Sequence, residues 1–314
     1  MENEKKIYQD NLITQSRYEF GLIEKRIIYL VIEKLREDYV ISQNPKQTTS
    51  NLTLEMNFSK LKCVSSNITL VYNTIHNMIG KTFQFNEGER TIIVPLITKF
   101  IHDRELENCY VTVDEEIVKR FIDLGKKYTA YNLTVAMSLR SEYSQRFYEY
   151  CSQFRVMGGW KTKIEDLRFK LCLEEKYDRY ANLKRYVIQT AYNELKTLYQ
   201  KGECNLYFEY SEQKKGRSIT GLTFKIIEKE SSNETVKLED LDYFVRVELH
   251  RLFDTENKPK NNAFVSKVMT TLRLEPEKFH LIEKKIVYTK EHIPQKEQTR
   301  YLRFIINEEL LNNN

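Results

Sequence analysis

The stretch ANLKRYVIQTAYNELKTLYQKGECNLYFEYSEQKKGRSITGLTFKII, residues 181–227, decides the fold of this chain. Its first part has apolar residues every three or four positions, which predicts a long helix over 181–200. The residues on the apolar face of this helix are Leu183, Val187, Ala191, Leu195 and Leu198. Alternation over 204–210 predicts a strand, and residues 218–227 are expected to return beside it. The segment SEQKKGR, residues 211–217, then forms the tip of a β-hairpin.

The residues before this stretch complete an order of elements that is typical of one fold. Residues 135–156 predict a strong helix, which Gly158 and Gly159 end. A short strand over 160–163 and a short helix over 164–171 follow. Helix, strand, helix, helix and hairpin is the order of a winged helix, a helix-turn-helix variant whose hairpin is the wing.

The first part of the chain has the same order with little sequence identity to the second. The expected elements are a helix over 17–38, a strand over 52–56, a short helix through Leu61, a helix over 66–79 and a hairpin with strands 83–85 and 91–96. We therefore predict a structural duplication in which each half is one winged helix.

Beyond residue 228 the sequence predicts helices only. After the linker ESSNET, residues 230–235, helices are expected over 236–253, 263–274, 277–289 and 296–311. The predicted fold class is therefore α+β and mostly helical. We expect two tandem winged-helix domains, residues 1–127 and 128–228, followed by a helical C-terminal extension, residues 229–314.

Positive charge is concentrated in the second predicted winged helix. The chain of 314 residues has 50 Lys and Arg, 45 Asp and Glu and a formal net charge of +5. Residues 131–228 contain 17 basic and 12 acidic residues, whereas the residues before and after them are balanced. This distribution fits one polyanion-binding module flanked by neutral regions. Because five charges is a small excess, charge alone leaves nucleic-acid binding open.

Motifs for catalysis, metal binding and membrane insertion are missing from the sequence. It has no P-loop, and its histidines never form HxH or HExxH. No apolar stretch reaches 18 residues, and the N-terminus lacks the apolar core of a signal peptide. We therefore predict a cytoplasmic protein that is not an enzyme and uses no metal and no cofactor. No CxxC pair is present, so we expect reduced core thiols at Cys63, Cys109, Cys151, Cys172 and Cys204.

The second predicted winged helix contains most of the candidate DNA-binding residues. The N-terminal end of a recognition helix faces base edges in the major groove, where Arg pairs with guanine and Asn with adenine. The candidates at this end are Arg179, Asn182, Lys184 and Arg185. Cations on a wing gain from counterion release along the phosphate backbone. The candidates there are Lys214, Lys215 and Arg217 at the hairpin tip, with Lys161 and Lys163 on the short strand.

The first predicted winged helix lacks such charge. Its helix 66–79 contains no Lys or Arg, and its hairpin tip has one cation beside Glu87 and Glu89. The residues that could contact DNA are Asn67, Thr69, Asn73 and Arg90. We expect a weaker DNA contact here, combined with a role in dimerisation.

Five segments in this order resemble the initiator (Rep) proteins of theta-replicating, iteron-containing plasmids. The segments are NLITQSRYEFGLIEKRIIYLVIEKL (11–35), MSLRSEYSQRFYEYCSQF (137–154), GGWKTKIEDLRFKLCL (158–173), KYDRYANLKRYVIQTAYNEL (176–195) and KKGRSITGLTFKI (214–226). The resemblance covers about residues 8–228 and leaves out the C-terminal extension. It implies two winged-helix domains, of which the second binds iterons, the repeated sites of the origin, and the first mediates dimerisation.

The resemblance also implies residue roles and partners. Lys184 and Arg185 match the family's basic pair on the recognition helix, whereas Tyr186 stands where many members have a basic or small residue. Base preference therefore cannot be transferred. The residues that match the family's wing are Lys214, Lys215 and Arg217. The implied partners are double-stranded iteron DNA, an operator inverted repeat bound by the homodimer, and the host replication initiator and replicative helicase.

The implied function is a plasmid replication initiator in the bacterial cytoplasm, associated with the nucleoid or plasmid. It would bind origin iterons, promote origin melting and helicase recruitment, take part in copy control, and repress its own gene. Two alternatives stay open. One is a winged-helix transcriptional repressor without a replication role. The other is a rolling-circle nickase, an enzyme, which the missing HxH motif disfavours.

Overall fold

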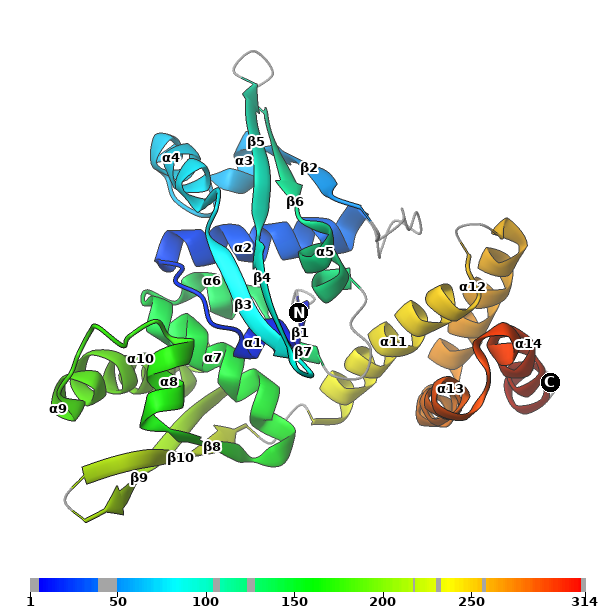
Figure 1. The fold of residues 1–314 in the computed structure, drawn as a ribbon. Helices are drawn as coiled ribbons and strands as arrows, with labels where there is room; N and C mark the ends of the chain where they lie inside the picture. Colours follow the sequence, from blue (N-terminus) through cyan, green and yellow to red (C-terminus); the bar gives the residue numbers. More distant parts are fainter. Residues whose placement is uncertain are drawn as a thin grey trace. The chain divides into compact units, whose positions relative to one another are not determined.

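The computed structural model describes residues 6–38, 50–103, 108–122, 128–216, 218–229, 233–255 and 258–311. They form two compact units, one made of the described residues up to Lys229 and one made of the described residues after it (Figure 1). The first unit contains two winged helices, and the second contains helices only. No helix among the described residues is long and apolar enough to cross a membrane.

The second winged helix has the predicted order of elements. It consists of α7 (Glu142–Phe154), β8 (Gly159–Lys163), α8 (Ile164–Lys170), the three-part helix α9 (Tyr180–Leu183), η3 (Lys184–Ile188) and α10 (Gln189–Lys201), and the hairpin β9 (Leu206–Lys215) and β10 (Ser218–Glu228). The strands form an antiparallel sheet in the order β8-β10-β9. The helix predicted over 135–156 is instead two helices, α6 (Leu133–Ser138) and α7. They separate because Ser141 is extended and caps α7, where its side chain accepts a hydrogen bond from the Tyr143 N–H.

Aromatic rings fill the core between α7 and this sheet. Trp160 stacks on Phe224 with the ring centroids 4.4 Å apart, and Phe147 stacks on Phe208 at 5.0 Å. Gly159, at the start of β8, has φ of +153°, and a Cβ there would lie 2.1 Å from the carbonyl oxygen of Phe224. Glycine is therefore required where β8 approaches β10.

The first winged helix repeats the architecture of the second. Its elements are α2 (Leu22–Arg36), β2 (Leu52–Asn57), α3 (Phe58–Leu61), α4 (Ile68–Met78), β5 (Ile97–Asp103) and β6 (Asn108–Val113). Its sheet has the order β2-β6-β5, which matches β8-β10-β9 element by element. The predicted duplication of the winged helix is confirmed.

The wing of this first domain was predicted in the wrong place. The hairpin of β3 (Thr82–Glu87) and β4 (Arg90–Pro95) is a separate two-stranded sheet inserted between α4 and β5. By topology the wing is formed by β5 and β6, and residues 104–107 between these strands lie outside the described residues. Alternation of apolar residues identifies a hairpin but does not say which sheet it joins, and this is why the prediction failed.

The inserted hairpin packs inward on the segment before α2. Gln84 of β3 exchanges two backbone hydrogen bonds with Arg17, with N···O distances of 2.8 and 2.9 Å. The ring of Phe83 is buried, and its centroid lies 5.0 Å from that of Tyr18 and 5.1 Å from that of Phe20. The hairpin is therefore part of the core and not a free arm.

Besides β5 and β6, four short elements were not predicted from the sequence. β1 (Lys6–Asp10) pairs with β7 (Tyr128–Asn132) in an antiparallel two-stranded sheet. The other two are the helices α1 (Asn11–Gln15) and α5 (Glu115–Ile122). β1 is the start of the described chain, and it therefore lies beside β7, the strand that precedes the second winged helix.

The cysteine prediction holds for three of five positions. Cys109, Cys151 and Cys204 are buried free thiols. Cys63 is exposed and Cys172 is half-buried, so neither is a core residue. Among the described residues, no three His, Cys, Asp or Glu side chains gather as metal ligands.

The second unit is the predicted helical extension. Its main elements are α11 (Asn233–Leu252), α12 (Pro259–Leu274), α13 (Phe279–His292) and α14 (Gln295–Ile306), with short turns at Pro276–Lys278 and Asn307–Leu311. Inside it, the buried carboxylate of Glu248 accepts hydrogen bonds from Arg251 at 2.9 Å and Lys290 at 3.0 Å. Burial of this charge is therefore compensated by two cations.

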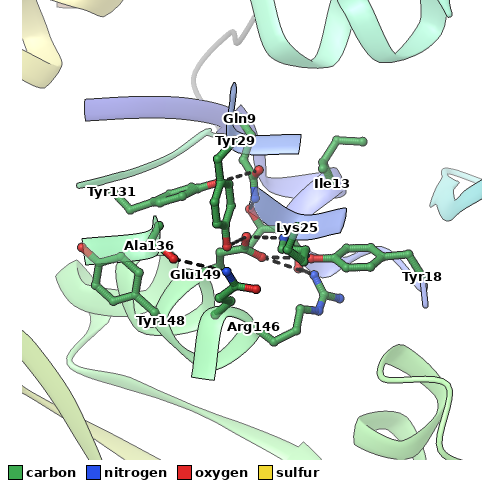
Figure 2. A network of polar contacts seen from close by, with 12 residues as sticks. Gln9, Ile13, Tyr18, Lys25, Tyr29, Tyr131, Ala136, Arg146, Tyr148 and Glu149 are labelled. Carbon is green, nitrogen blue, oxygen red and sulfur yellow. Dashed lines mark hydrogen bonds and ion pairs between the residues drawn. The ribbon is translucent and has the colours of Figure 1, made fainter. Parts of the chain in front are cut away.

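A buried carboxylate joins the two winged helices (Figure 2). Glu149 on α7 has no exposed surface. It accepts hydrogen bonds from the amine of Lys25 and from the phenols of Tyr18 and Tyr29, the latter two at 3.0 and 2.9 Å. Lys25 and Tyr29 belong to α2, and Tyr18 precedes it. All three donors therefore come from α2 or the segment before it, whereas the acceptor lies on α7, the helix that packs on the sheet of the second winged helix.

Arg146 extends this network toward the N-terminal segment. Its guanidinium lies 3.6 Å from the carboxylate of Glu149 and donates to the carbonyl oxygens of Thr14 and Ser16. Burial lowers the pKa of Lys25 to about 8, because the protonated amine loses contact with water. Burial of any one of these charges without its partners would destabilise the fold, so the charged groups are stable in the core only as a set.

We expect Glu149→Ala to lower the free energy of unfolding by about 3–5 kcal/mol, because it leaves buried cations without an acceptor. The measurement is urea unfolding followed by the fluorescence of Trp160, the single tryptophan of the chain. Glu19→Ala is the control, since it removes the exposed ion pair with Lys176 and should cost at most about 1 kcal/mol. Equal losses for the two variants would contradict the role given to Glu149.

Candidate nucleic-acid interface

One face of the helix 180–201, which we call the recognition helix, is exposed along much of its length. Its residues are Asn182, Arg185, Tyr186 and Asn193, which are exposed, and Gln189, which is half-buried. The opposite face is buried in the domain core through Leu183, Val187, Ile188, Ala191 and Leu195. We call these five residues the reading face. It presents a guanidinium, amides and a phenol, which are groups that hydrogen-bond base edges.

The reading face contains two of the residues predicted from the sequence, Asn182 and Arg185. It also contains Gln189 and Asn193, which the sequence analysis missed. Their amides are hydrogen-bonded to each other at 2.8 Å, and the oxygen of Gln189 accepts from the hydroxyl of Tyr210 at 3.1 Å. Gln189 lies four residues after Arg185, and Asn193 lies seven residues after Tyr186, so helical spacing could have identified both.

Lys184 is tied to the wing and does not belong to the reading face. Its amine lies 2.9 Å from Glu212 on β9, and the hydroxyl of Tyr180 donates to the same carboxylate at 2.9 Å. The hydrogen bond from Lys184 holds the pKa of Glu212 below its usual value. The pair fixes the start of the recognition helix against the first strand of the wing.

Arg168 organises the turn that leads into the recognition helix. Its guanidinium donates to four backbone carbonyl oxygens, those of Leu173 (3.2 Å), Lys176 (2.9 Å), Tyr177 (2.6 Å) and Asp178 (3.1 Å). Tyr177 has φ of +58°, which costs energy for a residue with a side chain. The four bonds compensate that cost and set the direction in which the recognition helix begins. Arg179, directly after this turn, is exposed.

The tip of the wing presents two exposed cations among its described residues. Lys214 and Lys215 end β9, and Lys215 pairs with Ser218 of β10. Gly216 has φ of +64°, which explains glycine at this turn. The predicted contact Arg217 lies outside the described residues.

Lys161 and Lys163 are also exposed, but they lie on β8, which β10 separates from β9. Lys163 is opposite Gly221, and Lys161 is opposite Thr223. They are therefore at the far edge of the sheet from Lys214.

In the first domain the predicted residues divide between two elements. Asn67 caps α4, with its side-chain oxygen accepting from the Leu70 N–H at 3.1 Å. Thr69 and Asn73 are exposed on α4. Arg90 is exposed on the inserted hairpin, so the structure does not place it on the wing where the sequence analysis had put it.

Two family models match the chain in the order of its two winged helices. The model of "Initiator Replication protein, WH1" matches residues 6–152, and that of "Initiator Rep protein, WH2" matches residues 163–226. Neither match extends into the helical C-terminal unit.

Individual proteins are similar to parts of the chain. A "Probable replication protein rep" of Bifidobacterium longum (strain NCC 2705) is 24% identical over 147 residues, which are 44% of this chain and 50% of that protein. The chain therefore matches about half the length of this curated relative. The crystal structure of Pi initiator protein in complex with iteron DNA is similar with a TM-score of 0.53 at 16% identity. This match covers 74% of the chain and all of that structure's chain. At this identity the structural match shows a shared fold.

We expect Arg168→Ala to loosen the turn before the recognition helix, because four carbonyl oxygens lose a charged donor. The loss of stability should be about 1–3 kcal/mol, and amide hydrogen exchange should become faster over residues 173–183. Hydrogen exchange with mass spectrometry measures this directly. Lys201→Ala, at the exposed end of α10, is the control and should leave exchange in the turn unchanged. Unchanged exchange in Arg168→Ala would show that the turn holds its shape without these bonds.

Proposed function

Because the chain belongs to the family of initiator replication proteins, we propose that it is a plasmid replication initiator that binds repeated sites in duplex DNA at the origin. The observation on which this proposal depends is the reading face beside a basic wing in the second winged helix. The recognition helix enters the major groove, and the wing follows the phosphate backbone.

Each part of this interface has its own contribution. Arg185 pairs with guanine through O6 and N7, and the amides of the reading face contact adenine. Lys214 and Lys215 release counterions from phosphates, which gives affinity that is independent of sequence and decreases steeply with salt. Asn182 and Arg179 at the start of the helix add base and phosphate contacts. Lys184 acts mainly by holding helix and wing together.

We assign the residues 1–127 to a dimerisation domain with an auxiliary DNA contact, and 128–228 to the main DNA-binding domain. The absence of Lys and Arg from α4 supports this division, because a helix without cations gains little from phosphates. A monomer in equilibrium with a homodimer can then bind single repeats or an inverted repeat at its own promoter.

Initiation by this mechanism uses binding energy and no catalytic side chain. Bending one site costs on the order of 1–6 kcal/mol, so several copies on tandem repeats can supply the deformation together. The strained DNA melts in an adjacent AT-rich segment, where the host initiator and helicase are recruited. The chain acts in the bacterial cytoplasm as a DNA-binding protein and not as an enzyme.

The proposal is tested on tandem repeats from the DNA that flanks the gene. We expect laddered shifts in a gel, one per repeat, and permanganate reactivity of thymines in the neighbouring AT-rich segment of supercoiled DNA. Specific shifts without melting would instead indicate a transcriptional repressor. Strand cleavage with magnesium would indicate a nickase.

We expect Arg185→Ala and Lys215→Ala to have different effects on DNA binding. Arg185→Ala should weaken binding to the preferred site about 10- to 100-fold, the value of one bidentate contact, with little effect on random DNA. Lys215→Ala should weaken both DNAs alike and reduce the slope of log affinity against log salt by about one. Fluorescence anisotropy at several salt concentrations measures both. Equal effects of the two variants on both DNAs would contradict this division of roles.

A further inference from the structure

Tyr186 places a large ring on the reading face. It is 46% exposed, although its neighbour Val187 is buried in the core. It lies in a π-helical turn, in which the N–H of Gln189 donates to the carbonyl oxygen of Lys184, five residues earlier. This wider turn leaves Arg185 and Tyr186 exposed side by side. Turns of this kind occur often at functional sites.

The ring of Tyr186 is ordered before any DNA binds. It stacks on Tyr177, with the centroids 5.6 Å apart and the planes at 25°. Tyr177 is itself fixed, because its carbonyl oxygen accepts a hydrogen bond from Arg168 at 2.6 Å. The guanidinium of Arg185 lies 5.2 Å from the ring centroid of Tyr186. Side chains that are already ordered lose little entropy on binding.

An apolar ring beside a guanidinium has a defined complement in the major groove. Guanine offers O6 and N7 to the guanidinium, and thymine offers the 5-methyl group, which apolar side chains contact. A phenol ring held over such a methyl group excludes water from it. The reading face therefore fits a guanine with a thymine next to it.

We propose that Tyr186 reads the 5-methyl group of a thymine that neighbours the guanine contacted by Arg185. This inference rests on the proposed DNA-binding function and extends it to sequence preference. Tyr186 is then a specificity-determining residue, and Tyr177 is a positioning residue that keeps its ring in the groove.

The test uses the full chain and a duplex that it selects from random-sequence DNA. Each thymine of the selected site is replaced in turn by deoxyuridine, which removes only the methyl group. For the unchanged protein we expect one replacement to weaken binding about fourfold, the value of one buried methyl group. Tyr186→Ala should lose this sensitivity. Tyr186→Phe keeps the ring and should retain it.

Each other outcome overturns the inference in a distinguishable way. If Tyr186→Ala and the unchanged protein select the same site and show the same deoxyuridine profile, Tyr186 does not read the methyl group and the proposed function stands. If Tyr186→Phe loses as much affinity as Tyr186→Ala on every duplex, the hydroxyl and not the ring makes the contact. If the unchanged protein selects no sequence, the proposed function fails together with this inference. Circular dichroism of each variant checks that it is folded.

Discussion

The carboxylate of Glu149 is removed from water and is satisfied by donors from the other winged helix. Lys25, Tyr18 and Tyr29 all precede it by more than one hundred residues in sequence, yet they contact one carboxylate. Removal of charges from water is costly, so this arrangement is stable only with all its partners in place. Displacement of one winged helix against the other would separate Glu149 from its donors and leave buried charged groups without hydrogen-bond partners. The two winged helices are therefore held as one unit around α2 and α7 (Figure 2).

The contacts between the two winged helices also determine where the recognition helix lies. Exposed pairs continue the contact between the domains: Arg17 donates to the carbonyl oxygen of Phe169, and Lys176 pairs with Glu19 at 2.7 Å. The first connects the segment before α2 to α8, and the second connects it to the turn that Arg168 organises. Because the backbone of Arg17 also pairs with the inserted hairpin, a continuous set of contacts connects the first domain to the start of the recognition helix. The reading face is thereby held in a fixed orientation before DNA binds, which reduces the entropy lost on binding.

The sequence predicted the parts of this structure that depend on local periodicity. The recognition helix, its buried face and the basic wing follow directly from residues 181–227, and the helical extension follows from its own spacing. The sheet that a hairpin joins depends on contacts far apart in sequence, so β3–β4 was mistaken for a wing. The partner of Lys184 could not be predicted for the same reason, because Glu212 lies on β9 and not on the recognition helix. The buried network was missed since Glu149 and Arg146 look like an ordinary polar face of an amphipathic helix.

The central claim is that the reading face of the second winged helix recognises DNA while the Glu149 network keeps the two domains as one unit. A crystal structure of the chain bound to a duplex that it selects tests this most directly. We predict Arg185 and Tyr186 in the major groove, Lys214 and Lys215 along the phosphates, and an intact network at Glu149. A complex in which α4 or the C-terminal helices occupy the groove, with the reading face in solvent, would contradict the account.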